Sequence, residues 1–196
     1  MGILKLSSQA IDMLQEMAPQ LRYDGRSNII SGSISFDLRL EDNNNRITIK
    51  DTYQIEIDLN NVSRERIPVI KETSGRILGI AQRKGLAPAD LHIGDDGAMC
   101  IINPIKIRER YPNGFDLAEL IKHIQEHLYW VSYFEKYDKE PWEAYGHGEK
   151  GILEAYLENT IKYSKDFFDF LKVCYCCNSR TEMRRVTRHL RKKYKV

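Results

Sequence analysis

The sequence predicts an α+β fold in which a helix precedes an antiparallel meander and further helices follow it. Three observations support this prediction. Apolar residues recur at helical spacing near the N-terminus, alternate with polar residues over two long runs in the first third of the chain, and return to helical spacing after residue 116. A group of strands between helices, without strand–helix alternation, is typical of an α+β layout.

Two helices are predicted from their caps and apolar stripes. The first begins at Ser7 or Ser8, because a serine hydroxyl is a common helix cap. Its stripe consists of Ile11, Leu14, Ala18 and Leu21. The second begins at Asp116, another typical cap, and ends near Pro141. Its stripe consists of Leu117, Leu120, Ile121, Ile124, Leu128 and Val131. Residues 151–173 are also expected to be helical.

Three strands are predicted between these helices. Residues 30–40 and 47–59 alternate apolar and polar side chains, and the polar residues 41–46 between them favour a turn. The two runs therefore predict an antiparallel hairpin, in which Asp51 interrupts the buried set. A third strand is expected over residues 67–73.

Residues 74–104 show no periodicity and are expected to be irregular. Glycines and prolines interrupt this stretch at Gly75, Gly79, Gly85, Pro88, Gly94, Gly97 and Pro104. Irregular segments of about 30 residues are uncommon in compact domains and often carry function. Cys100 lies inside this stretch.

The composition is that of an ordinary globular protein. Hydrophobic residues make up 42% and charged residues 30%, with both signs mixed, which argues against disorder, collagen and a coiled coil. No run approaches the ~18 apolar residues of a membrane span, and residues 1–6 lack the features of a secretory signal. The 4 cysteines are too unevenly spread for a disulfide scaffold. We therefore expect a cytoplasmic protein with reduced thiols and no membrane contact.

The net charge of +2 conceals an asymmetry along the chain. From Arg180 onward there are eight lysines and arginines against Glu182 alone, so this tail carries +7 and the rest of the chain −5. A dedicated nucleic-acid-binding domain carries its basic face on the fold itself. Nucleic acid is therefore not expected as the main partner.

Two short motifs match patterns of catalytic or cofactor-binding sites, but we do not expect them to be such sites. His123 and His127 fit the H-x-x-E-H pattern of inverted zinc proteases, but no obvious third zinc ligand follows them. They are expected on a half-exposed flank of the helix. Residues 146–151 fit G-x-G-x-x-G, but the strand that a dinucleotide site needs does not precede them.

A cysteine cluster near the C-terminus leaves two interpretations open. Cys174, Cys176 and Cys177, with His189 after them, could supply zinc ligands, although no second ligand pair follows at a familiar interval. The other interpretation, which we favour, is a frayed basic tail that carries thiols. No other metal site is expected.

Cys100 has more informative neighbours. A lone cysteine beside methionine and isoleucine is more often a buried core thiol than a reactive one. The alternative is a nucleophile on a glycine-containing loop, with His92 nearby in the sequence. Such a thiol needs no strong base, because a free cysteine with a pKa of about 8.5 is already a few per cent thiolate at neutral pH.

The surroundings of Cys100 resemble the active-site region of the ubiquitin-conjugating (UBC) fold. In that family a proline-bearing strand, here residues 67–73, leads to a histidine motif, here His92, and then to a G-x-x-C step, here Gly97 to Cys100. Bacterial stand-alone members are more similar still, because they add a W…H-G-x-x-G-[IL]-x-x-x-Y segment. The matching residues here are Trp142, His147, Gly148, Gly151, Ile152 and Tyr156.

The resemblance implies a fold, a division of the chain and an activity. It implies a UBC-like α+β domain over residues 1–160, with an N-terminal helix, an antiparallel β-meander, an extended active-site cysteine segment and C-terminal helices. Residues 161–196 would be a helical extension with a basic, Cys-containing tail. Cys100 would carry the C-terminus of another protein as a thioester and pass it to an amine, with no metal or organic cofactor.

The resemblance also implies roles for residues near Cys100. His92 would orient the loop by hydrogen bonds rather than act as a base. The family has His-Pro-Asn where this chain has His92-Ile93-Gly94, so the asparagine that stabilises the oxyanion is missing. Asp95, Asn103 and His147 are the candidates for polarising the thioester or steering the amine.

Two classes of partner and one alternative function follow. Bacterial relatives occur in antiphage operons such as CBASS, so the donor would be a ubiquitin-like protein or a cGAS-like nucleotidyltransferase. The chain has no nucleotide-binding loop, so a separate activating enzyme would supply the adenylation. The alternative is a non-catalytic UBC-like interaction module with a buried Cys100, which acts through its basic tail on zinc-stabilised partners or nucleic acid.

Overall fold

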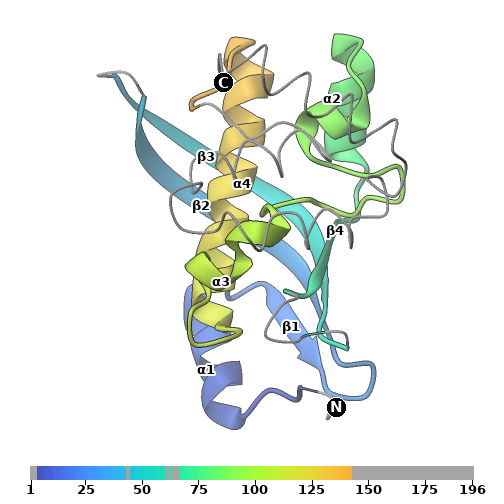
Figure 1. The fold of residues 1–196 in the computed structure, drawn as a ribbon, viewed down its shortest axis with the longest axis vertical. Coiled ribbons are helices and arrows are strands. Elements are labelled where there is room, and N and C mark those ends of the chain that lie inside the picture. The colour runs from blue at the N-terminus through green and yellow to red at the C-terminus, as the bar shows by residue number, and fades with distance from the viewer. Residues whose placement is uncertain (1–3, 43–44, 61, 63–66, 143–196) are drawn as a thin grey trace, which may run out of the picture. The chain divides into compact units, whose positions relative to one another are not determined.

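The computed structural model describes residues 4–42, 45–60, 62 and 67–142 (Figure 1). The chain forms two compact units, one of residues 1–102 and 107–144 and the other of residues 103–106 and 145–196. The predicted helix over residues 151–173 lies outside the described residues, and the division of the chain at residue 160 stays a prediction.

The N-terminal helix α1 (Ser8–Met17) is confirmed, and Ser7 is its cap. The Ser7 hydroxyl oxygen accepts a hydrogen bond from the backbone N–H of Ala10 at 3.2 Å. The helix ends earlier than its stripe predicts, because a residue before proline disfavours helical dihedrals and Pro19 follows Ala18. Leu21, expected on the helix, lies in the first strand instead.

A four-stranded antiparallel sheet follows in the order β1-β2-β3-β4. Its strands are β1 (Leu21–Asp24), β2 (Ile29–Asp42), β3 (Asn45–Asp58) and β4 (Val69–Glu72). The predicted hairpin is therefore confirmed, with Ile34 opposite Tyr53 and Leu38 opposite Ile49. Its strands extend to Asp42 and from Asn45, so the turn is shorter than predicted. Strand β1 was not predicted, because four residues are too few to show alternation.

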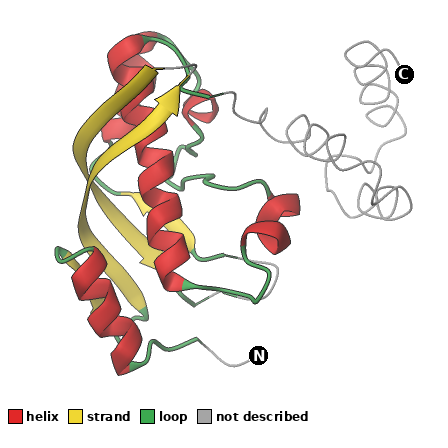
Figure 2. Ribbon diagram, turned by 90° about the vertical axis from the view of Figure 1, so that its left-hand side faces the viewer, coloured by secondary structure: helices red, strands yellow, loops and turns green. Residues whose placement is uncertain are grey.

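The long helix α4 (Leu117–Tyr137) lies against one face of the sheet (Figure 2). As predicted, Asp116 caps it, since its carboxylate accepts the N–H of Glu119 at 2.8 Å. The core between helix and sheet consists largely of fully buried aliphatic side chains, each of which contributes about 1.5–3 kcal/mol. They include Ile34, Ile55 and Ile57 from the sheet and Leu120, Ile124 and Leu128 from the helix.

The prediction that residues 74–104 are irregular is confirmed for residues 92–103 but wrong for much of the stretch before them. The stretch contains helix α2 (Arg76–Lys84) and the 3₁₀ turn η1 (Pro88–Leu91). Gly75 and Gly85, which suggested irregular structure, are the two caps of α2, and both adopt left-handed dihedrals that suit glycine. The short elements η2 (Pro104–Lys106), in the second unit, and α3 (Ile107–Arg110) complete the described part of the chain.

An ion-pair network fixes α2 to the sheet and to α4. The Arg76 guanidinium pairs with Asp51 of β3 at 2.7 Å and with Glu135 of α4 at 2.8 Å. It also lies over the Tyr53 ring, 4.3 Å from the centroid. Asp51 interrupts the apolar pattern of β3 because it serves this network, and its second oxygen accepts the Ser132 hydroxyl.

Candidate active site

The segment that carries Cys100 extends the sheet beyond β4. The backbone N–H of Met99 donates to the Ile70 carbonyl at 2.8 Å, and the N–H of Glu72 donates to the Gly97 carbonyl at 2.9 Å. The segment also turns back on itself, since the Gly94 N–H donates to the Ala98 carbonyl at 2.8 Å. Residues 94–99 are therefore fixed by main-chain hydrogen bonds.

Gly97, the glycine of the G-x-x-C step, has a steric reason to be glycine. Its φ is +81°, and a Cβ at this position would lie 2.7 Å from the carbonyl oxygen of Glu72. Backbone cannot move aside as the end of a flexible side chain can. A side chain here would push the cysteine segment away from β4.

Cys100 is an exposed residue at the end of this fixed segment. Its backbone N–H donates to the His92 carbonyl at 2.8 Å, and its Sγ lies 4.0 Å from the Ile102 carbonyl oxygen. The protein around the sulfur still removes enough water to raise the pKa of the Cys100 thiol. Cys100 can therefore be reached from solvent, and among the described residues no positive charge offsets the rise in its pKa that burial causes.

His92 is hydrogen-bonded to Cys100 through its backbone carbonyl, and its ring lies against α4. The residue has left-handed dihedrals, with φ 54° and ψ 39°, which are disfavoured for a residue with a side chain. Its half-buried ring packs edge-on against Trp130, with centroids 5.5 Å apart, and against His127 at 5.9 Å. This geometry suits a residue that orients the loop.

The expectation that His123 and His127 form a half-exposed flank is wrong for His127, which is only 9% exposed. Burial lowers the pKa of His127 to about 3 and that of His123 to about 4. The charge of Arg110 also lowers the pKa of His123, whereas the Ile101 carbonyl opposes the shift. Both imidazoles are therefore neutral at neutral pH.

The other contacts of these two histidines differ. Nδ1 of His123 lies 3.1 Å from the Tyr111 hydroxyl. Nε2 of His127 is buried and has no hydrogen-bond partner among the described residues. Among the described residues, no group of three or more His, Cys, Asp or Glu side chains is placed to bind a metal ion.

The other predicted site residues are only partly brought together. Asp95 is exposed on the turn that leads to Cys100. Its neighbour Asp96 pairs with Lys71 of β4 at 2.8 Å. Asn103 belongs to the second compact unit, where its carbonyl accepts the N–H of Lys106 at 2.8 Å. Five of the predicted residues lie outside the described part of the chain: His147, Cys174, Cys176, Cys177 and His189.

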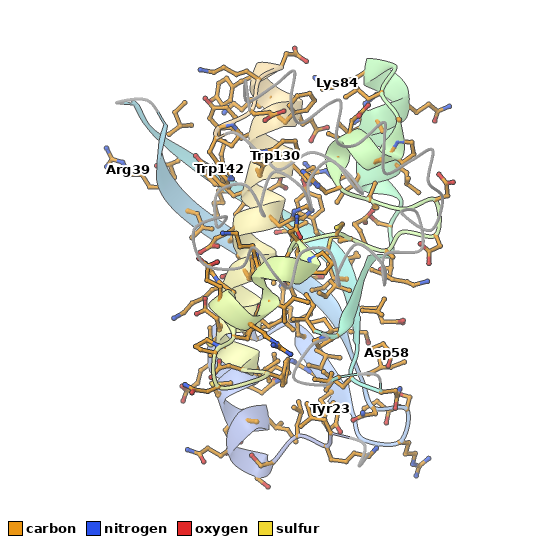
Figure 3. The ribbon with its side chains drawn as sticks, viewed as in Figure 1. Tyr23, Arg39, Asp58, Lys84, Trp130 and Trp142 are labelled. Carbon is orange, nitrogen blue, oxygen red and sulfur yellow. The ribbon has the colours of Figure 1, made fainter. Side chains whose placement is uncertain are left out.

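Sequence reasoning missed the α4 side chains that contact the cysteine segment. His123, His127 and Trp130 recur at i, i+4 and i+7, so they share one face of the helix. Trp130 also stacks on Phe134, and its ring N–H donates to the Trp142 carbonyl at 3.4 Å (Figure 3). The spacing was visible in the sequence, but the segment that covers this face was not.

Comparisons with other proteins give no family assignment: no family model matches the chain, and neither a curated protein nor a solved structure matches it. A search of the described helices for one long and apolar enough to cross a membrane also finds none.

Proposed function

We propose that this chain is a UBC-like acyl carrier in which Cys100 is the nucleophile. The observation that carries the proposal is an exposed thiol at the end of a segment fixed to a sheet by main-chain hydrogen bonds. The order of N-terminal helix, four-stranded meander, cysteine segment and long helix supports a UBC-like fold. Helix α2, between β4 and the cysteine segment, is an addition to the order that the resemblance implies.

The proposed reaction has two acyl-transfer steps. In the first, the Cys100 thiolate attacks the activated C-terminal carbonyl of a donor protein, a C–S bond forms, and the donor's leaving group departs with its electron pair. In the second, a neutral amine attacks the thioester, a C–N bond forms and the C–S bond breaks. The amine proton passes to solvent, and the Cys100 thiolate is regenerated.

The raised pKa of the Cys100 thiol agrees with an activated donor. A thiol without a neighbouring base or cation is a poor nucleophile toward an unactivated amide, but it reacts with a thioester or an acyl adenylate. A ubiquitin-like protein or a cGAS-like nucleotidyltransferase, charged by a separate activating enzyme, is therefore the proposed donor. The chain itself needs to supply only position and access.

The residues left to assist the second step differ in what they offer. An ionised carboxylate accepts hydrogen bonds only, so Asp95 suits steering of the incoming ammonium group and cannot stabilise the oxyanion. Asn103 and His147 carry N–H donors and stay the candidates for that second role. A free lysine, with a pKa of about 10.4, is neutral in less than about one part in a thousand at pH 7. A carboxylate can attract its ammonium form to the thioester, but it also favours that form, so the proton lost before the attack passes to solvent.

The direct test is a thioester assay with a matched cysteine control. The chain is incubated with a candidate donor, its activating enzyme and ATP, and the adduct is resolved with and without reducing thiol. We expect an adduct that the thiol removes, that is lost in Cys100→Ala, and that becomes a thiol-resistant ester in Cys100→Ser. The triple variant Cys174→Ser, Cys176→Ser, Cys177→Ser should keep it, and a thiol-sensitive adduct that persists in Cys100→Ser would contradict the proposal.

A second test needs no donor. The folded protein is treated with iodoacetamide, and the labelled cysteines are identified by peptide mapping. We expect Cys100 to be alkylated under native conditions, because it is exposed. If the tail cysteines are labelled and Cys100 is not, the acyl-carrier proposal fails and the interaction module with a buried thiol becomes the better account.

A further inference from the structure

His92, whose carbonyl accepts the Cys100 N–H, is in a conformation that needs support. A non-glycine residue with left-handed dihedrals costs about 1–2 kcal/mol relative to ordinary backbone. The His92 N–H is satisfied by the Ala89 carbonyl at 2.8 Å, but this bond alone does not fix the ring. The contacts of the His92 ring include His127 and Trp130 on α4.

His127 is an unusual choice for the position that it occupies. The side chain, on α4, is buried, and its Nε2 has no hydrogen-bond partner in the described part of the chain. A neutral imidazole has one N–H and one lone pair, and a buried one left unpaired costs about 1–3 kcal/mol. A leucine of similar size would avoid this cost. The imidazole is therefore explained best by a polar contact that the Nε2 atom can make.

The ring of His92 is a polar group close to His127. The two ring centroids are 5.9 Å apart and the ring planes are inclined by 73°, so an edge of one ring faces the other. At this separation a small rotation of either ring brings a nitrogen of one close to a nitrogen of the other. Two neutral imidazoles can then share one hydrogen bond, because one donates and the other accepts.

We propose that His127 is a positioning residue for Cys100. When the two rings rotate toward each other, its Nε2 exchanges a hydrogen bond with the ring of His92, which helps to hold that ring against Trp130 and so supports the left-handed backbone of His92. The His92 carbonyl in turn fixes the Cys100 N–H and the direction of the thiol. His127 touches no reacting group in this account. The inference rests on the proposed role of Cys100 for its functional meaning, but its structural content can be tested without an acyl donor.

The test compares two substitutions that separate the shape of His127 from its polarity. His127→Leu fills the space without a polar atom, and His127→Gln keeps a polar group at similar reach. The main measurement is native-state hydrogen exchange of the Cys100 amide, and the second is the tautomer of the His92 ring from its ¹⁵N chemical shifts. Ile124→Val, which removes one methylene from the same buried helix face, is the matched control.

We expect the Cys100 amide of His127→Leu to exchange about tenfold faster than in the unmodified protein, although urea unfolding shows equal or greater global stability. The His92 tautomer should change in the same variant. His127→Gln should restore exchange to within about threefold, and Ile124→Val should leave exchange and tautomer unchanged.

Three results overturn the inference. Exchange that stays slow in His127→Leu shows that Nε2 does not fix Cys100. Equally fast exchange in the Leu and Gln variants shows that ring shape alone matters. Equally fast exchange in Ile124→Val shows a general response to core mutation.

A reciprocal variant keeps the test decisive if His127→Leu does not fold. His92→Asn removes the imidazole and tolerates left-handed dihedrals, so it should accelerate Cys100 exchange to the same extent. It should accelerate exchange equally in the unmodified background and in His127→Gln, because the hydrogen bond that His92→Asn removes is present in both. Exchange of the Cys100 amide that stays slow in His92→Asn contradicts the inference. None of these measurements uses a donor, so their failure leaves Cys100 as the proposed nucleophile, and failure of the thioester assay leaves them unaffected.

Discussion

Acidification from pH 7.5 to pH 5 should destabilise this protein through two buried histidines. His123 and His127 have folded-state pKa values of about 4 and about 3, below the ordinary value of 6.5. Between pH 6.5 and these values, the unfolded chain therefore binds two protons that the folded chain does not bind. Their contribution to stability is fully present above pH 6.5 and is lost as the pH falls toward 4.

The size of this loss of stability follows from how far the pH lies below the pKa of histidine in the unfolded chain. At pH 5 each histidine is about 1.5 pH units below 6.5, and each unit corresponds to about 1.4 kcal/mol, so each costs about 2 kcal/mol and the pair about 4. Asp51 and Asp96, whose pKa values are lowered from 3.8, destabilise the fold only at more acidic pH. A loss of 4 kcal/mol is a large part of the 5–15 kcal/mol typical of a domain.

Urea unfolding followed by tryptophan fluorescence measures this loss. Both tryptophans of the chain, Trp130 and Trp142, belong to the first compact unit, and Trp130 contacts His92. His127→Leu and His123→Gln should each remove about half of the difference between pH 7.5 and pH 5. A free energy of unfolding that changes by less than about 1 kcal/mol between the two pH values would refute the reasoning, as would single variants that keep the full difference.

Three further predictions concern the cysteine segment and its support. In urea unfolding, Gly97→Ala should lower the free energy of unfolding by about 1–3 kcal/mol more than Gly85→Ala does. Both glycines have positive φ, but only Gly97 has a carbonyl oxygen 2.7 Å from the added Cβ. Equal losses in the two variants would contradict this prediction. Arg76→Met should cost about 1–3 kcal/mol, because Asp51 loses its ion pair and Glu135 keeps only the pair with Arg83. Arg83→Met, at the exposed end of the network, should cost less than about 1 kcal/mol. Alkylation of Cys100 should be slower at pH 8 in the folded than in the urea-unfolded protein, because burial raises its pKa, and a faster folded rate would show an activated thiolate.

The elements that the sequence predicts correctly are those specified by their own residues. The hairpin of β2 and β3 has fourteen residues in each strand, so its alternation is unmistakable, and the caps Ser7 and Asp116 each act on an N–H three residues away. Helix α2 has the same local character, but a glycine in a sequence is compatible with both a break and a cap, and Gly75 and Gly85 are caps. Strand β1 is too short to show a pattern.

The environment of the candidate site depends on contacts between distant parts of the chain. Whether Cys100 is exposed is decided by the bonds of its segment to β4, about 30 residues earlier. The burial of His127 is likewise not a property of α4 alone, because the facing ring of His92 comes from 35 residues earlier in the sequence. A helical wheel places His123 and His127 on one side, but it cannot say which side another segment covers.

The account depends most on the acceptance of an acyl group by Cys100, and a chemical donor tests this without an activating enzyme. A peptide ending in a C-terminal thioester is offered to the folded chain, and the modified residue is located by mass spectrometry. The account predicts one acyl group on Cys100, removed by hydroxylamine, with the same result in the variant that lacks Cys174, Cys176 and Cys177. Acylation confined to those tail cysteines, with Cys100 unmodified in the folded protein, would contradict it.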